Sequence, residues 1–121
     1  MVASKETNSL DTIDVKVTLK DIANIIGHIC DNSYGVVGLT RSKNIKDNIA
    51  TILNYDNYIE GIFLKKYRNK YIVDIHVVIV YGVKITEVVN ELSKHISYVL
   101  EKYFGKIFSK INIYVEELRV L

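Results

Sequence analysis

A strand, a glycine turn and a long helix follow one another between Tyr71 and Phe104, and this order constrains the fold more than any other feature of the chain. The segment YIVDIHVVIVYG is dense in β-branched and aromatic residues, which are typical of strands. The segment that follows it, VKITEVVNELSKHISYVLEKYF, repeats its apolar residues at the spacing of one helix face. The pattern therefore predicts a strand over 71–81 and a helix over 85–104, with Gly82 at the junction.

Two further apolar segments predict the rest of the sheet. Residues 62–67 read as a strand, and the polar residues 68–70 are typical of a hairpin turn that leads into the next strand. Residues 110–117 alternate apolar and polar side chains, which predicts a third strand after the long helix. Because a right-handed crossover through a helix joins parallel strands, we expect the second and third strands to be parallel. Gly105 is well placed to end the helix.

The N-terminal third of the chain carries weaker signals. Residues 1–12 are polar and without periodicity, which predicts a disordered tail. The alternation in residues 13–17 is compatible with a short edge strand, and apolar spacing predicts a helix over 18–31 and a second, shorter one over 44–54. Between these helices, the segment GVVG at 35–38 predicts a turn.

These elements define the expected fold class and domain organisation. We expect an α+β, two-layer domain over residues 13–121 with a three-stranded mixed sheet, built from a β-hairpin and a β-α-β crossover. One long helix and two shorter N-terminal helices complete this prediction. A chain of 121 residues is long enough for one domain with its own core.

Composition limits which kinds of partner and which cellular compartment the sequence predicts. Sixteen Lys and Arg against fourteen Asp and Glu leave a net charge of +2, too small to indicate a nucleic-acid or membrane partner through bulk charge. The single cysteine, Cys30, cannot form an intramolecular disulfide, and we expect it in the core. No apolar run reaches the roughly 18 residues that a membrane-spanning helix needs. We therefore expect a cytoplasmic protein without direct membrane insertion.

Asp74 and His76 are the residues of the second strand most suggestive of chemistry, and Val78 and Val80 continue their face. An Asp beside a His can orient an imidazole for base catalysis, but no motif ties a nucleophile to the pair, so an ordinary polar pair is the preferred interpretation. Both faces of this strand are largely apolar, and one should meet the long helix. The other face is covered either by the N-terminal helices or by another molecule.

A local basic cluster with interleaved aromatic residues occupies the predicted hairpin: Lys65, Lys66, Tyr67, Arg68 and Lys70. Such a hairpin can hold phosphates and stack bases, or lie on anionic lipid headgroups. Basic residues at hairpin tips also serve as solubility devices that discourage edge pairing, and this is the preferred interpretation.

No pattern indicates a cofactor, a metal or a catalytic centre. His28, Cys30 and His95 lack the paired short spacing of a zinc site. The glycines at 35 and 38 are not followed by the Lys and Ser or Thr of a phosphate-binding loop. We therefore expect no cofactor and no enzymatic activity.

With its elements in this order, the chain resembles the alkaline shock protein family, that is, the Gls-type envelope stress proteins of low-GC Gram-positive bacteria. The residues that carry the resemblance are Ile22 and Ala23, Gly35-Val36, the Tyr81-Gly82-Val83 turn, Ile85 with Glu87-Val88, and the strand Ile111-Asn112-Ile113-Tyr114-Val115. The likeness extends from about Val15 to Val115. The segment NIKDNIATILNYDNY is less typical of the family.

The resemblance implies a non-catalytic cytoplasmic protein linked to cell-envelope homeostasis and stress. Some members are held at the membrane by a separate membrane-spanning partner, and others are encoded beside a fatty-acid kinase subunit. We therefore expect function through protein-protein interaction, as a homo-oligomer or with a membrane-anchored partner, and a location in the cytoplasm or at the membrane through that partner. The alternative is a nucleic-acid-binding module that uses the hairpin around Lys65 to Lys70, and we rank it below a protein partner.

Overall fold

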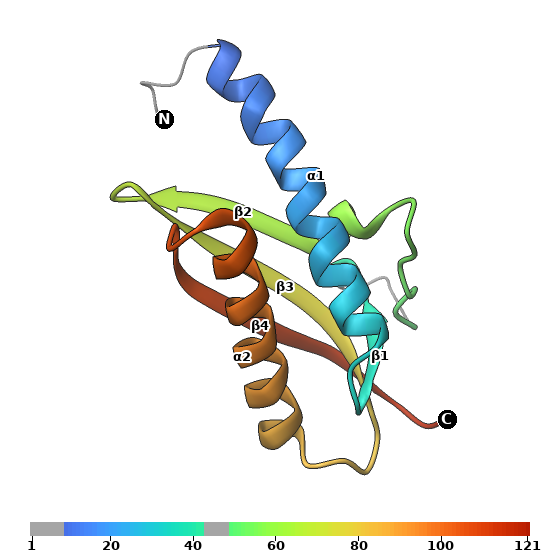
Figure 1. The fold of residues 1–121 in the computed structure, drawn as a ribbon. Helices are drawn as coiled ribbons and strands as arrows, with labels where there is room; N and C mark the ends of the chain where they lie inside the picture. Colours follow the sequence, from blue (N-terminus) through green and yellow to red (C-terminus); the bar gives the residue numbers. More distant parts are fainter. Residues whose placement is uncertain (1–8, 43–48) are drawn as a thin grey trace.

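The computed structural model describes residues 9–42 and 49–121 as two α-helices packed on a four-stranded sheet (Figure 1). In chain order the elements are α1 (Ser9–Asp31), β1 (Val36–Leu39), the 3-10 helix η1 (Tyr58–Gly61), β2 (Ile62–Tyr67), β3 (Lys70–Val80), α2 (Ile85–Phe104) and β4 (Phe108–Arg119).

The central strand of the sheet is β3. Along one edge it pairs in parallel with β4, from Tyr71 to Val80. Along the other edge it pairs antiparallel with two strands in succession, β2 at residues 70–75 and β1 at residues 77–79. Each of the other three strands therefore pairs with β3.

Both helices lie on the same face of the sheet (Figure 1). The core between them combines Ile22 and Ile26 from α1, Leu92, Ile96 and Leu100 from α2, and Val73, Ile75, Val77 and Ile79 from β3. The four β3 residues alternate along the strand, as side chains on one face must, and all four are fully buried. Burial of an aliphatic side chain stabilises a fold by roughly 1.5–3 kcal/mol, so this layer is the main source of stability.

A close contact fixes η1 against α1. A Cβ atom built on Gly27 of α1 would lie 2.3 Å from Cγ of Tyr58, so only glycine fits beneath this ring. The hydroxyl of Tyr58 donates a hydrogen bond to the carboxylate of Asp31, at the end of the same helix. Burial, and then this hydrogen bond, raise the pKa of Tyr58 to about 12. The contact positions the chain where it enters β2.

The predicted three-stranded sheet with three helices is wrong. Among the described residues the sheet has four strands and the α-helices number two. The additional strand is β1, which lies where a turn was predicted at 35–38. Val36 and Leu39 bury their side chains there, and the register of the pairing with β3 shifts between Val36 and Gly38. A strand forms because β2 leaves part of the β3 edge unpaired.

The N-terminal predictions also need correction. Residues 13–17 belong to α1, so the predicted edge strand is wrong. Residues 1–8 of the predicted tail lie outside the described residues, and α1 begins at Ser9. The second short helix was predicted over 44–54. Its first part lies outside the described residues, and its remainder is not helical, since Ile52 forms a β-bridge with Thr40.

The hairpin and the crossover follow the sequence pattern closely. Arg68 and Asn69 both adopt positive φ angles of 51° and 66°, which a two-residue hairpin turn of the favoured hand requires. Gly105 ends α2 with φ 81°, and its backbone N–H donates to the carbonyl of Glu101. The chain then returns as β4 beside β3.

Replacing Gly27 with alanine tests the close contact between α1 and η1. In an unobstructed helix this change stabilises by about 1 kcal/mol. Here the added methyl group meets the Tyr58 ring, so we expect Gly27→Ala to lower the free energy of unfolding by about 1–3 kcal/mol in a urea titration. Asn90→Ala at an exposed position of α2 is the control and should be neutral or slightly stabilising. A stabilised Gly27→Ala protein would contradict the packing described.

Candidate functional site

The candidate residues of β3 lie on the face of the sheet opposite α1 and α2, which we call the open face. Asp74, His76 and Val78 alternate with the core residues of the same strand and therefore point the other way. Their neighbours on β4, in register, are Asn112, Tyr114 and Glu117. Helix α1 does not cover this face, because it packs on the same side of the sheet as α2 (Figure 1).

Asp74 is held by partners on both neighbouring strands. One carboxylate oxygen accepts a hydrogen bond from the Asn112 amide at 2.9 Å, and the other lies 3.4 Å from Nζ of Lys65. Asp74 is buried, and these contacts compensate for its removal from water. Its oxygens are directed to Asn112 and Lys65, so the suggested orientation of His76 by Asp74 is not what the structure shows.

The carboxylate that holds His76 comes from Glu116 on β4. Nδ1 of His76 lies 2.7 Å from a carboxylate oxygen of Glu116, and both side chains are largely buried. The imidazole also stacks on the Tyr114 ring, with centroids 5.2 Å apart and planes 20° from parallel. Sequence reasoning missed Glu116 because it is distant along the chain. A β-bulge after Val115 brings it beside His76.

Val78 is not available to a partner, contrary to its place in the predicted interaction surface. It is fully buried, while Val80 is partly buried. In register Val78 lies between Gly38 of β1 and Glu117 of β4. Both neighbours contact the segment 49–53, since Gly38 faces Ile52 and Glu117 binds Ala50. This segment therefore covers the part of the open face around Val78.

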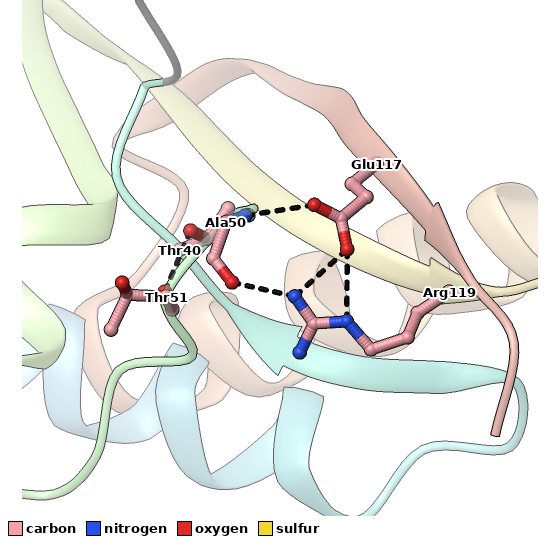
Figure 2. A network of polar contacts seen from close by, with 5 residues as sticks. All are labelled: Thr40, Ala50, Thr51, Glu117 and Arg119. Carbon is pink, nitrogen blue, oxygen red and sulfur yellow. Dashed lines mark hydrogen bonds and ion pairs between the residues drawn. The ribbon is translucent and has the colours of Figure 1, made fainter. Parts of the chain in front are cut away.

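A polar network fastens this segment to β4, and we call it the Ala50 clasp (Figure 2). The backbone N–H of Ala50 donates to Glu117 at 2.8 Å, and Arg119 donates to the Ala50 carbonyl at 2.5 Å. Nε of Arg119 also donates to Glu117 at 2.8 Å, which holds the two side chains together. On the β1 side, the Thr40 hydroxyl donates to the carbonyl of Thr51.

The basic hairpin does not form a one-sided patch. Lys65 lies on the open face with Asp74, whereas Lys66 pairs with Tyr71 and lies over its ring at 5.9 Å. The Arg68 guanidinium lies 5.1 Å from the centre of the Tyr67 ring. Separately, Nζ of Lys70 donates to the carbonyl of Lys106. The structure thus directs these side chains to different sides of the hairpin and into contacts within the chain.

Aromatic side chains remain exposed on the open face around the polar pairs. Phe63 is 58% exposed, Tyr67 56% and Tyr114 45%. Phe63 pairs with Asp74 and Tyr114 pairs with His76, so two of the aromatic residues flank the polar contacts of Asp74 and His76. Large aromatic residues around fixed polar groups are typical of protein-protein interfaces.

A groove of about 710 Å³ lies on the other side of the molecule, between the end of α1 and α2. Tyr34, Glu87 and His95 are among its lining residues. None of the residues singled out in the hairpin or in β3 lines it. No sequence pattern indicated this groove, because its two walls come from separate helices.

Cys30 and His28 are the remaining candidates from the sequence, and both lie near the end of α1. Cys30 is fully buried, which confirms the expected core position, and burial raises the pKa of its thiol to about 12. His28 is exposed, so the two side chains do not lie together. Neither α1 nor α2, the helices of the described ranges, has the length and apolar character needed to cross a bilayer.

Removing Arg119 tests the Ala50 clasp. Arg119→Ala deletes hydrogen bonds to the Ala50 carbonyl and to Glu117, and we expect the free energy of unfolding to fall by about 1–2 kcal/mol. Hydrogen exchange of the Ala50 amide should become faster as well. Arg41→Ala is the matched control because it removes only an exposed ion pair with Glu60, worth about 0–1 kcal/mol. Equal effects of both variants would contradict the role assigned to the clasp.

Comparison with known proteins identifies the family. Residues 5–120 match the alkaline shock protein 23 family, described as having a cell envelope-related function. The chain is 32% identical over 117 residues to the uncharacterized protein Spy1614 of Streptococcus pyogenes serotype M6, covering 95% of this chain and 97% of that protein. It is 27% identical over 106 residues to the uncharacterized protein YloU of Bacillus subtilis, with 88% of each chain covered. No solved structure gave a significant match. The chain therefore belongs to the alkaline shock protein family.

Proposed function

We propose that the protein is a non-catalytic interaction module that supports the cell envelope by binding other proteins, including copies of itself. The family supplies the cell envelope-related role. The finer assignment to the Gls-type stress proteins, with a cytoplasmic location or attachment to the membrane through a partner, is part of this proposal. The partner that we favour is a protein rather than a nucleic acid or a lipid.

The observation that carries the proposal is the combination of fixed polar groups and exposed aromatic side chains on the open face. His76 and Asp74 are held by Glu116 and Asn112 rather than directed at a cavity. Phe63 and Tyr114 stand beside them and are about half exposed. A rigid surface with aromatic anchors loses little conformational entropy on binding, which favours recognition of a protein partner.

The nucleic-acid alternative finds less support in the hairpin geometry. A binding groove for a single strand needs basic and aromatic groups along one continuous surface. Here Lys65 is paired with Asp74, Lys66 lies on the opposite side of β2, and Lys70 is bonded to the Lys106 carbonyl. A gel-shift titration tests this alternative: binding of RNA or DNA at low salt that weakens steeply as salt is added would favour it.

Affinity capture from native cells, with membrane and soluble fractions kept apart, tests the proposed function. We expect the wild-type chain to retain a specific protein that the double variant Phe63→Ser, Tyr114→Ser retains at least about tenfold less. Tyr98→Ser is the control, because Tyr98 is 69% exposed but lies on α2. Retention that is the same for all three proteins would remove the open face as the binding surface. Turnover of a small substrate that depends on His76 would refute the non-catalytic role.

A further inference from the structure

The outer edge of β4 is an unusually long strand edge. With 12 residues β4 is the longest strand, and within residues 9–42 and 49–121 it pairs only with β3. Among these described residues, no strand pairs with the other edge of β4. The chain contains no proline, so none of the edge is blocked by a residue that lacks an N–H. Such an edge is a template for another strand.

The register shows which backbone groups point outward. In a parallel pair, some residues direct both their N–H and their C=O at the neighbouring strand. Such a residue does not bond its own register partner. It forms hydrogen bonds with the two residues that flank that partner. Tyr71 and Tyr81 donate to the carbonyls of Ile107 and Arg119, so the odd-numbered residues of β3 face β4. Ile113, the register partner of Ile75, consequently directs its own N–H and C=O outward.

The same reasoning applies to Ile111 and Val115, which are partners of Val73 and Val77. Three alternate residues, centred on Ile113, thus offer hydrogen-bonding pairs at the outer edge. A second strand that runs antiparallel to β4 can use all of them if its own alternate residues match this spacing.

The apolar residues of β4 are complementary to those of a second copy of β4. In an antiparallel pairing with the two-fold axis at Ile113, Ile111 lies opposite Val115 of the partner copy. Phe108 lies opposite Leu118 of the partner copy. All of these side chains are on the helix side of the sheet, as their register partners on β3 show. Val115 is 36% exposed and Leu118 41%, so the pairing would cover apolar surface that α2 leaves open.

The charged residues are complementary in the same register. Lys110 lies opposite Glu116 of the partner copy, and the two-fold axis repeats this pair. Both residues belong to the open face, Lys110 as the register partner of Ile72 and Glu116 as the partner of His76 in the ion pair. Cross-strand pairs of opposite charge stabilise a pairing and fix its register. A two-fold axis brings the same strand of both copies together, so a strand that is complementary to itself is enough to form a closed dimer.

We propose that two copies of this chain associate through antiparallel pairing of their β4 strands, with Ile113 at the two-fold axis and Lys110 of each copy facing Glu116 of the other. This inference rests on the self-association included in the proposed function and names its surface. The two sheets become one continuous sheet, and the open faces of both copies lie on the same side. A partner protein would then meet a doubled binding surface.

A charge swap tests this register with the purified full chain. We expect wild-type protein to form a dimer whose population rises with concentration in analytical ultracentrifugation. Lys110→Glu and Glu116→Lys each place like charges opposite one another twice, which should raise the dimer dissociation constant by about tenfold. An equimolar mixture of the two variants should restore a dimer, because each copy then faces an opposite charge. Lys20→Glu is the control of equal charge change, on α1, and should not alter the dimer.

Each outcome decides a different part of the inference. Glu116→Lys also removes the contact with His76, so Leu118→Lys is a second variant that tests the apolar side of the interface. A wild-type chain that stays monomeric at all concentrations overturns the inference, while capture of a partner by the open face would still support the proposed function. If neither Lys110→Glu nor Leu118→Lys weakens the dimer, the chain self-associates through another surface and the inference is wrong. Loss of the dimer without rescue in the mixture overturns the register.

Discussion

The structure depends on one strand that is buried on one side and bonded on both edges. The helix-facing side chains of β3, from Val73 to Ile79, make the core with α1 and α2. Its two edges hold β4 on one side and β2 and β1 on the other. Because the hydrophobic contact is the dominant favourable contribution to folding, loss of this layer would remove the support of every other element.

The opposite side of the same strand shows how a sheet surface can be ordered without a second layer of helices. Asp74 and His76 each receive a charged or amide partner from a neighbouring strand, so their polar groups remain satisfied while they are partly or wholly removed from water. The aromatic side chains around them keep much of their surface exposed. The sheet therefore separates a stabilising side from the side on which we propose that a partner binds.

The parts of the fold that depend on local pattern could be predicted from the sequence, whereas the parts that depend on distant contacts could not. The hairpin, α2 and the parallel strand β4 follow from periodicity and from Gly105. Residues 13–17 were misassigned because Ile13 and Val17 fit a helical spacing as well as a strand alternation. β1 was missed because its pairing depends on how much of β3 is left free by β2. Glu116 was missed for the same kind of reason, since only the bulge in β4 places it beside His76.

The Ala50 clasp has a consequence for how much of the sheet is accessible. By holding the segment 49–53 over Gly38 and Val78, it closes one end of the open face and leaves the hairpin end uncovered. If this segment were shorter, or if β4 lacked Arg119, Val78 and the backbone of Gly38 would be exposed. In this chain the hydrogen-bonded segment covers them. The length of this one connection thus sets how much of the open face is accessible, while the pairing of β3 with the other three strands does not involve it.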